Sequence, residues 1–308
     1  MSIALAIGFI GVGNMGGAMA ANLLARAWNV HVHDIEPSRT QALASNGARV
    51  AQSPLELARE TDVIIIAVVN AAQTEDVLFG AQGIVHAAPV ATAEGGAARA
   101  SKTVLLCPTI APKDVERFTA RLMAAGFAAI DAPMSGGPER AREGEMSLMV
   151  ACPLALFHEH QVLLQALASR LFHVSERQGD GARTKLVNNL LAAINLVGAA
   201  EALALAQRIG LEPKRTLEVI EQSSGQSWIG SDRLRRALDG DEAPRAHMSL
   251  LTKDSGLALE MARRSGFAGP LGAHAHAAFA QACQDGWAHV DDGALYRLLQ
   301  QGLPTIKA

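Results

Sequence analysis

The sequence predicts an α/β N-terminal domain built on a doubly wound, mostly parallel sheet, followed by an all-α C-terminal domain joined to it by a long helix. Apolar runs typical of buried parallel strands alternate with helical stretches in the first half of the chain. A glycine-rich turn directly follows the first of these runs, and no convincing strand appears after Val174. We therefore expect domains at residues 1–176 and 177–308.

The composition is typical of a globular protein with two separate cores. The chain has 308 residues, of which 49% are hydrophobic and 19% are charged, and this length gives room for two domains. Its net charge of −3 offers no general attraction to nucleic acid or acidic membranes, and only 4% of residues are aromatic. We predict no nucleic-acid partner and no membrane partner.

Cysteine usage and the apolar segments indicate a reducing, cytoplasmic location. Cys107, Cys152 and Cys283 are too few and too scattered for a disulfide framework or a CxxC site, so no metal is predicted. Residues 3–10 lack a basic leader and run into glycines, which favours a strand over a signal peptide. Residues 186–206 are a poor membrane span because four polar residues interrupt them: Asn188, Asn189, Asn195 and Glu201.

The glycine-rich turn lies between a predicted strand, Ile7–Ile10, and a predicted helix, Ala18–Arg26. Glycine at the first two positions permits a tight turn and a close approach of the backbone to a pyrophosphate, and the third glycine lets helix and strand pack closely. The N-terminus of the helix presents N–H groups and a partial positive charge to the phosphates. A dinucleotide cofactor is therefore predicted to bind six consecutive residues, Gly11-Val12-Gly13-Asn14-Met15-Gly16.

Asp34 ends the next predicted strand, Val30–Asp34, where an acid binds the adenosine ribose hydroxyls of a dinucleotide. A 2′-phosphate there would meet a like charge, so NAD is favoured over NADP. Arg39 keeps NADP open, since a nearby arginine accommodates that phosphate. The alternative is a strand-terminal aspartate that only caps a turn at Pro37.

Two further loops follow predicted central strands and are expected to touch the cofactor. Val69 and Asn70 follow the continuous apolar run Asp62–Val68. Thr109 follows the strand Thr103–Leu106, where its hydroxyl is placed to contact the nicotinamide side. Thr109 is alternatively a turn threonine ahead of the next helix.

A loop with the sequence Ser135-Gly136-Gly137 lies between two predicted strands, Phe127–Asp131 and Met146–Val150. Prolines flank it on both sides, and its small, polar composition is not that of a hydrophobic core. It reads as a rigid loop that presents backbone N–H groups and one hydroxyl, which suits a substrate carboxylate. The alternative is an ordinary turn.

The long helix is predicted from Gly181 to Ala206, and its first turns carry Lys185, Asn188 and Asn189. Positions i, i+3 and i+4 lie on one helix face, so the three side chains should project side by side. An ammonium beside two carboxamides offers a movable proton and fixed hydrogen-bonding groups, which suits acid–base work on a hydroxyl or carbonyl. The alternative is a solvated lysine on the first turn of a core helix.

Two residues of the C-terminal half are further candidates. Lys253 stands at the start of a predicted helical stretch, Leu257–Arg263, and either is solvated or reaches the cofactor. Trp228 ends a polar break between helices and either packs internally or lines the substrate pocket. The cleft between the domains is the expected site, and the apolar helical half suggests a homodimer or homotetramer.

Four stretches occur in an order that resembles the β-hydroxyacid dehydrogenase family, which includes 3-hydroxyisobutyrate dehydrogenase and tartronate semialdehyde reductase. They are residues 8–16, Asp131–Gly137, Gly181–Asn189 and the pair Lys253-Asp254, and the resemblance covers nearly the whole chain. Within the family, the chain most resembles the branch that acts on four-carbon sugar acids such as L-threonate. Four shorter segments carry that likeness: Val68–Gln73, Val77–Gly80, Ser227-Trp228 and Leu238–Asp241.

The resemblance implies a Rossmann-type NAD(P)-binding domain and hydride transfer between a small hydroxy acid and the nicotinamide. It implies that Lys185 is the catalytic general acid and base, and that Asn189 holds the lysine and the substrate. It also implies that Ser135–Gly137 is a carboxylate-binding loop. Two further residues, Lys253 and Thr109, are then implied to contact the cofactor.

The chain departs from the family pattern in two places. Pro108-Thr109 stands where many members carry Ser-Thr, so one cofactor-side hydroxyl is missing. The stretch Pro89–Ser101, predicted to be a mobile surface loop, is longer than usual. Both departures bear on cofactor affinity and substrate choice more than on the type of reaction.

The substrate stays open among L-threonate, D-erythronate, 3-hydroxyisobutyrate and short-chain semialdehydes. Two other functions compete: an imine reductase, in which the lysine position is commonly replaced, and a non-catalytic dinucleotide-binding protein with a degenerate site. Lys185 argues against the first, and Lys185, Asn189 and Ser135 together argue against the second.

Overall fold

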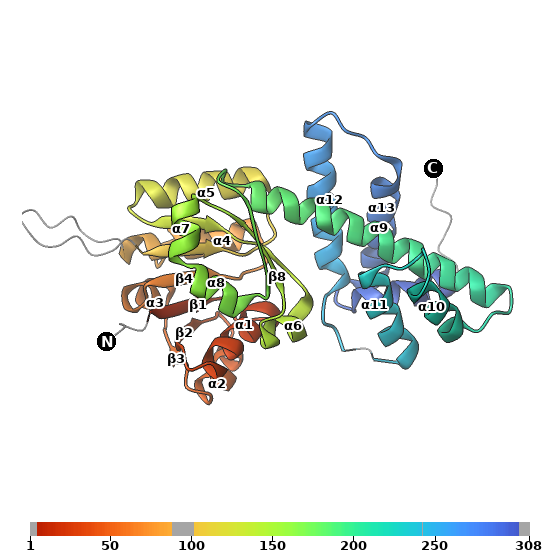
Figure 1. Ribbon diagram of the computed structural model, residues 1–308, viewed down its shortest axis with the longest axis horizontal. Helices are drawn as coiled ribbons and strands as arrows, with labels where there is room; N and C mark the ends of the chain where they lie inside the picture. Colours follow the sequence, from red (N-terminus) through yellow and green to blue (C-terminus); the bar gives the residue numbers. More distant parts are fainter. Residues whose placement is uncertain (1–4, 88–101, 242, 302–308) are drawn as a thin grey trace, which may run out of the picture. The chain divides into compact units, whose positions relative to one another are not determined.

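The computed structural model describes residues 5–87, 102–241 and 243–301 (Figure 1). The predicted surface loop Pro89–Ser101 lies outside these residues. The chain forms two compact units, Met1–Lys185 and Leu186–Ala308. The division between the two units falls within one continuous helix, α9 (Asp180–Arg208), whose first turn packs on the sheet of the first unit.

The first unit contains one sheet of nine strands in the order β3-β2-β1-β4-β5-β6-β8-β7, with β9 beside β8. Neighbouring strands from β3 to β6 are parallel, β8 is antiparallel to β6, and β9 is parallel to β8. The order 3-2-1-4-5-6 is that of a doubly wound dinucleotide-binding sheet, which confirms the predicted fold class. The strands are β1 (Ala6–Ile10), β2 (Asn29–His33), β3 (Arg49–Val50), β4 (Val63–Ile66), β5 (Thr103–Leu106), β6 (Ala128–Asp131), β7 (Met134–Ser135), β8 (Ser147–Ala151) and β9 (Arg170–Ser175).

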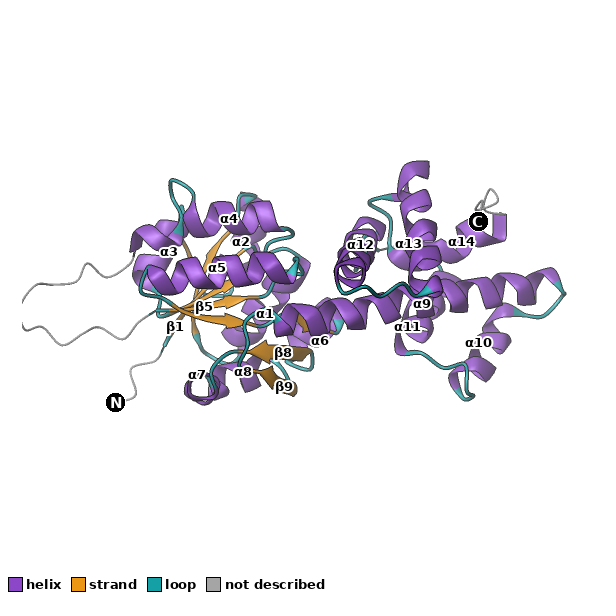
Figure 2. Cartoon of the chain, turned by 90° about the horizontal axis from the view of Figure 1, so that it is seen from above, coloured by secondary structure: helices purple, strands orange, loops and turns teal. Residues whose placement is uncertain are grey.

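Helices cover both faces of this sheet, as Figure 2 shows. Successive strand residues point to opposite faces, so Phe9 and Ile65 belong to one fully buried core and Ile10 and Ile64 to another. The first core packs under α1, α2, α6, α7 and α8, and the second under α3, α4, α5 and the start of α9. The helices are α1 (Asn14–Ala25), α2 (Pro37–Ala44), α3 (Pro54–Glu60), α4 (Ala71–Phe79), α5 (Pro112–Ala124), α6 (Gly137–Glu143), α7 (Leu154–Glu159) and α8 (Gln161–Leu167), with a 3-10 turn at Ile84–Ala87.

Two short strands, β3 and β7, were not expected from the sequence. Each has two residues, which is too short for any hydrophobic alternation to appear. Ser135 therefore lies on an edge strand, where it pairs with Ser147 of β8, rather than in an irregular loop. The two glycines that follow it carry the turn.

A buried carboxylate fixes the first turn of α9 on the sheet. Asp131 ends β6 and is 1% exposed, and its Oδ2 accepts a hydrogen bond from the backbone N–H of Ala182 over 3.1 Å. A Cβ on Gly181 would lie 2.6 Å from the carbonyl oxygen of Met149 and 2.9 Å from Cγ of Asp131, so only glycine allows this approach. The helix that carries Lys185 is thus held one turn before that residue.

The same burial changes the proton affinity of this carboxylate. Desolvation raises the pKa of Asp131 to about 7, although hydrogen bonds from the backbone of Ala182, Gly179 and Gly181 favour the charged form. Asp180 adds a smaller like-charge repulsion. The negative charge at the helix N-terminus is therefore present mainly above neutral pH.

Among the described residues from 186 onward, the elements of the second unit are all helices, apart from one isolated β-bridge between His247 and Asp291. Its core joins α9 to the later helices through buried residues such as Leu203, Leu234, Met248 and Phe279. The later helices are α10 (Pro213–Glu221), α11 (Trp228–Asp239), α12 (Met248–Arg264), α13 (Pro270–Ala282) and α14 (Leu295–Gln301), with a π turn at Cys283–Trp287 and a 3-10 turn at Asp292–Ala294. Among the described residues, α9 is the one helix long and apolar enough to cross a membrane by length and composition, a test that core helices also pass.

Two buried ion pairs tie α11 to the segment before α14. Arg233 Nε donates to Asp292 Oδ1 over 2.6 Å, and Arg236 Nη2 donates to Asp291 Oδ1 over 3.0 Å. All four residues are less than a tenth exposed. Removing one partner would leave an uncompensated buried charge, so these pairs fix how the two segments pack.

Replacement of Asp131 by asparagine is expected to remove a pH-dependent part of the stability. Because the pKa of Asp131 is about 7 in the folded protein and 3.8 in the unfolded chain, the folded protein binds more protons than the unfolded chain between these pH values. The contribution of Asp131 to stability is therefore fully present below about pH 4 and is lost as the pH rises through 7, by about 4 kcal/mol. Urea unfolding at several pH values between 4 and 8 measures this slope.

The exposed Asp76, replaced by asparagine, is the matched control and should keep the wild-type slope. An Asp131→Asn protein whose stability changes with pH as steeply as the wild type would contradict the assignment of the buried proton to Asp131.

Candidate active site

The glycine turn has the backbone geometry that a pyrophosphate requires. Gly11 has a φ of +88°, in the left-handed region that favours glycine, and a Cβ on Gly16 would lie 2.0 Å from the carbonyl oxygen of Gly11. The helix α1 begins at Asn14, earlier than the expected Ala18, and its N-cap Gly13 provides no side-chain cap. A Cβ on Gly13 would meet only the guanidinium of Arg39, at 3.7 Å. The turn therefore leaves space above a helix N-terminus, which fits a phosphate.

Asp34 links the glycine turn to the end of β2. Its Oδ2 accepts a hydrogen bond from the backbone N–H of Val12 over 2.8 Å, and its Oδ1 accepts one from Glu36 over 2.9 Å. The hydrogen bond from Glu36 caps the turn, which is the alternative role considered for Asp34 in the sequence analysis. The hydrogen bond from Val12 holds the carboxylate next to the predicted phosphate site. Arg39 Nη1 lies 3.7 Å from Asp34 Oδ1 and has a half-exposed side chain.

The loops after β4 and β5 lie at the carboxyl edge of the sheet, where ligands bind in doubly wound folds. Asn70 is the N-cap of α4: its Oδ1 accepts from Gln73 N over 2.9 Å, and Gln73 Oε1 accepts from Val69 N over 2.9 Å. This reciprocal cap makes the loop rigid. The loop also adjoins the glycine turn, because a Cβ on Gly11 would lie 2.9 Å from the carbonyl oxygen of Ala67.

Thr109 lies two residues after the buried Cys107, beyond the end of β5, and is half-buried. Burial raises the pKa of Cys107 to about 12, and it does the same for Cys152 at the end of β8. Both thiols stay protonated and unreactive, so neither serves as a nucleophile. The hydroxyl of Thr109 is the functional group that this loop offers.

The Ser-Gly-Gly segment turns sharply after β7. Gly136 has a φ of +133° and Gly137 a φ of +76°, so two successive residues occupy conformations that favour glycine. Gly136 is the N-cap of α6, without a side-chain cap. Backbone N–H groups next to the Ser135 hydroxyl form a short polar turn that suits a carboxylate.

Lys185 and Asn189 stand one turn apart on α9, and both are buried, with 8% and 9% of their surface exposed. Asn188 lies beside them at an exposed position, and its Nδ2 donates to Asn189 Oδ1 over 3.1 Å. Buried polar groups of this kind need defined partners. The face predicted from the sequence spacing is thus a polar strip within a largely apolar helix.

Asp254 was not singled out as a site residue from the sequence, yet it connects two residues that were. Its Oδ2 accepts from Asn189 Nδ2 over 2.7 Å, and its Oδ1 accepts from Lys253 Nζ over 2.7 Å. Lys253 lies inside α12, which begins earlier than expected, at Met248. An acid next to a lysine on a helix usually forms a solvated pair, so the sequence signal for Asp254 was only its place in the Lys253-Asp254 motif.

Trp228 is the first residue of α11 rather than part of a polar break. The N-cap of that helix is Ser227, whose Oγ accepts from Gly230 N over 3.1 Å. The indole is 42% exposed, and the guanidinium of Arg233 lies 6.0 Å from its ring centroid.

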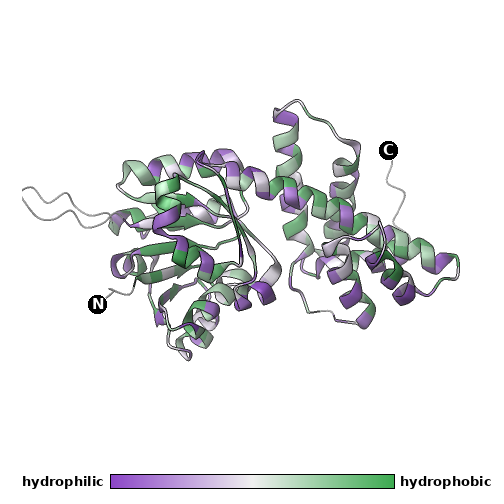
Figure 3. Ribbon diagram, viewed as in Figure 1, coloured by the Kyte–Doolittle hydropathy of each residue, from purple (hydrophilic) through white to green (hydrophobic). Residues whose placement is uncertain are grey.

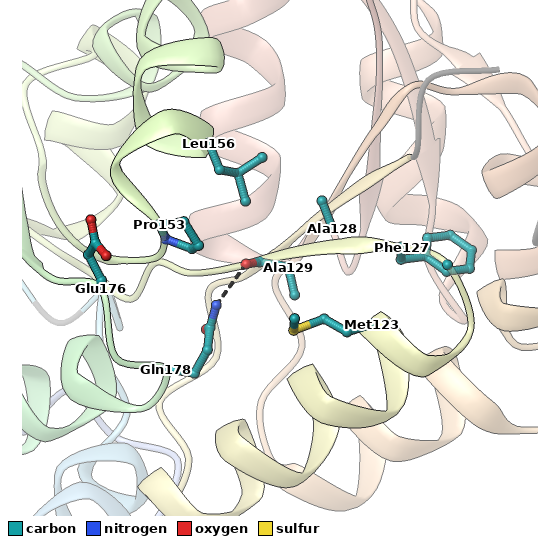
Figure 4. Close-up of a pocket in the computed structure, with 9 residues that line it drawn as sticks. Met123, Phe127, Ala128, Ala129, Pro153, Leu156, Glu176 and Gln178 are labelled. Atoms are coloured by element: carbon teal, nitrogen blue, oxygen red, sulfur yellow. Dashed lines mark hydrogen bonds between the residues drawn. The ribbon is translucent and has the colours of Figure 1, made fainter. Parts of the chain in front are cut away.

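One pocket of the first unit, of ≈ 480 Å³, contains none of the predicted site residues (Figure 4). It lies by the start of β6, at Ala128 and Ala129, whereas doubly wound sheets bind ligands at the carboxyl ends of their strands. Two of its polar atoms are engaged, since Gln178 Nε2 donates to Ala129 O over 2.9 Å and Glu176 Oε1 accepts from Leu154 N over 3.2 Å, whereas the buried Oε1 of Gln178 has no hydrogen-bond partner. We do not assign the chemistry to this pocket.

No group of three or more His, Cys, Asp or Glu side chains that could hold a metal ion occurs among residues 5–87, 102–241 and 243–301. The functional groups described above are an amine, amides, hydroxyls and backbone N–H groups. They suit a nicotinamide dinucleotide and an acid–base partner.

Two family models match the chain in succession. The NAD binding domain of 6-phosphogluconate dehydrogenase matches residues 6–175, and the NAD-binding domain of NADP-dependent 3-hydroxyisobutyrate dehydrogenase matches residues 179–299. The L-threonate dehydrogenase of Cupriavidus necator is 37% identical over 292 residues, which is 95% of this chain and 95% of that protein.

Solved structures agree. The 3-hydroxyisobutyrate dehydrogenase of Salmonella typhimurium is 32% identical, with a TM-score of 0.86 over 96% of this chain and 99% of that one. Psf3, solved with NADP⁺ and 2-OPP, is 27% identical, with a TM-score of 0.85 over 95% and 99% of the two chains. Matches of this length and identity show that the chain belongs to the β-hydroxyacid dehydrogenase family and is an NAD(P)-dependent dehydrogenase.

Proposed function

We propose that this enzyme oxidises a small hydroxy acid, L-threonate or a similar four-carbon sugar acid, with Lys185 as general base and NAD⁺ as hydride acceptor. The observation that carries the proposal is the buried polar strip of α9, in which Lys185 precedes an asparagine whose amide Asp254 holds in place. A buried amine beside a fixed amide is suited to moving one proton at one substrate atom.

Residues 1–176 then form the NAD(P)-binding domain and residues 177–308 the all-α C-terminal domain. The nicotinamide, when bound, accepts the hydride that leaves the carbinol carbon. Lys185 takes the hydroxyl proton as the carbonyl forms, and it returns that proton in the reverse direction. Asn189 orients the hydroxyl, while Ser135, Gly136 and Gly137 hold the carboxylate and fix the distance between carboxylate and carbinol.

For the cofactor, we propose that the backbone of Gly11–Gly16 holds the pyrophosphate and that Asp34 binds the adenosine ribose. Val69, Asn70, Thr109 and Lys253 then contact the nicotinamide half. NAD is favoured because the Asp34 carboxylate would repel a 2′-phosphate. Two observations favour NADP instead: Arg39 lies near Asp34, and the Psf3 structure contains NADP⁺.

For the substrate, the C. necator relative favours L-threonate, and the Salmonella structure keeps 3-hydroxyisobutyrate as the alternative. A panel of hydroxy acids that includes D-erythronate, assayed with NAD⁺, together with tartronate semialdehyde, assayed with NADH, tests the choice through the absorbance of the reduced cofactor. We expect the highest kcat/KM with L-threonate or another four-carbon sugar acid. We also propose a cytoplasmic location and a homo-oligomer.

Replacement of Lys185 by methionine, which keeps the apolar stem and removes the amine, is expected to lower kcat by about 10² to 10⁴. Binding of NADH, followed by its fluorescence, should stay within a few-fold of the wild type because the glycine turn is untouched. Lys214→Met on α10 is the matched control, since that amine pairs with Asp239 at an exposed position. A Lys185→Met enzyme with wild-type kcat on the best substrate would exclude the lysine mechanism.

Replacement of Asp34 by asparagine is expected to shift the cofactor preference toward NADP⁺. The amide keeps an acceptor for Val12 N but carries no charge, so the ratio of kcat/KM for NAD⁺ to that for NADP⁺ should fall at least about tenfold, or about 1.4 kcal/mol. Arg39→Ala should move the ratio in the opposite direction, and Arg59→Ala should leave it unchanged. An unaltered ratio in Asp34→Asn would place cofactor selection elsewhere.

A further inference from the structure

A gap between β6 and β8 opens the pocket of ≈ 480 Å³ in the first unit. The ladder between these two strands consists of one residue pair, Asp131 and Ala151. Two residues further along this antiparallel register, Pro153 would face Ala129, and proline has no N–H group to donate to the Ala129 carbonyl. The chain turns there into α7, and Gln178 Nε2 donates to Ala129 O instead, over 2.9 Å. A proline at the end of the strand thus explains why the sheet parts at this point.

The walls of this pocket are apolar. Figure 4 shows Leu156 and Pro153 on one side of β6 and Met123 on the other, with Phe127 toward one end. The strands around the pocket are apolar as well, as Figure 3 shows for the centre of this unit. A volume of ≈ 480 Å³ lies within the range of small-molecule sites, which bury an organic molecule mainly through apolar contacts. The pocket therefore suits a ligand with an apolar body.

One charged side chain, Glu176, lies among the residues that line the pocket, all of which the structure describes. Its Oε1 accepts a hydrogen bond from Leu154 N over 3.2 Å, which fixes the carboxylate. The neighbouring Arg177 is paired with Asp180 over 3.0 Å, so its charge is directed to the start of α9. The pocket should therefore attract a cationic ligand and repel an anionic one.

The amide of Gln178 selects in the same direction. Its Nε2 already donates to Ala129 O, while its buried Oε1 has no hydrogen-bond partner in the part of the chain that the structure describes. A buried acceptor without a donor costs free energy. A ligand N–H group can supply that donor, and a carboxylate cannot.

We propose that this pocket is a second ligand site, outside the active site, which binds a small organic amine with an apolar body. The ammonium group lies between Glu176 and Gln178, and the apolar body lies between Met123 and Leu156. A fatty acid or another apolar anion would meet the carboxylate of Glu176, and a neutral apolar molecule without a donor would leave Oε1 of Gln178 unsatisfied. The inference concerns a binding site and does not depend on which hydroxy acid the enzyme oxidises.

The test compares three probes that share a phenyl ring and differ at the other end: phenethylamine, phenethyl alcohol and hydrocinnamate. Isothermal titration calorimetry of the full chain at neutral pH measures their affinities. We expect phenethylamine to bind with one molecule per chain and about fivefold tighter than the alcohol, since a partly exposed ion pair contributes little more. Hydrocinnamate should give no saturable heat. The midpoint of thermal unfolding should rise with the concentration of the amine, because the amine binds the folded protein.

Variants of the lining residues test the placement of the amine. Glu176→Gln should remove the preference for the amine over the alcohol, whereas Glu159→Gln, at an exposed glutamate of α7, is the matched control and should keep it. Leu156→Trp and Ala128→Leu each fill the space and should abolish binding. Leu154→Trp, at an exposed leucine of α7 outside the lining, should keep it. Circular dichroism and the thermal midpoint without ligand separate lost binding from lost folding.

Hydrogen exchange locates the bound amine. Protection should appear in residues 123–129, 153–156 and 176–178 and not in the glycine turn at 11–16. Protection at the glycine turn, equal binding of hydrocinnamate, or binding that survives both Leu156→Trp and Ala128→Leu would overturn the proposal. So would the absence of saturable binding of phenethylamine up to about 10 mM. None of these outcomes bears on Lys185, whose role is tested by its own substitution.

Discussion

The hydrogen bond between the carboxylate of Asp131 and the first turn of α9 is the interaction on which the chemistry of the first unit depends. Because α9 is unbroken, fixing its first turn sets both the direction and the rotation of the helix at Lys185. The close contact demands glycine at 181, since any Cβ would collide with the backbone of Met149. A buried acid is costly in a strand end, but here the backbone N–H groups of a helix N-terminus offset much of that cost.

A second carboxylate plays a comparable part in the helical unit. Asp254 accepts from the amide nitrogen of Asn189, and Asn188 donates to its amide oxygen, so the two ends of the Asn189 carboxamide cannot exchange places. The same carboxylate holds the ammonium of Lys253. An amide of fixed orientation can tell a hydroxyl donor from a carbonyl acceptor, which a freely turning amide cannot do.

The sheet and the helical half could be predicted from the sequence because each produces a hydrophobic pattern over many residues. The β4 run of four buried aliphatic residues and the glycines of the turn at Gly11 are local patterns with few other uses. The sequence missed β3 and β7, whose two residues carry no period, and it placed the start of α12 too late, because Ser249 and Thr252 weaken the apolar pattern ahead of Lys253. The roles of Asp131 and Asp254 could not be predicted for another reason. Their hydrogen-bond partners, the backbone of Ala182 and the side chain of Asn189, are 51 and 65 residues away in the sequence.

The geometry of a single helix explains how α9 combines a polar site with an apolar core. Residues advance by about 100° along an α-helix, so Val187 and Leu191 lie about 200° from Lys185 and Asn189 respectively. The exposed apolar side chains and the buried polar side chains are therefore on opposite sides of the helix. Lys185 and Asn189 occupy only the first turns of α9, and the helical core packs on its later buried residues, such as Ala193, Leu196 and Leu203. One unbroken helix can thus present a polar face near its start and an apolar face to the core beyond it.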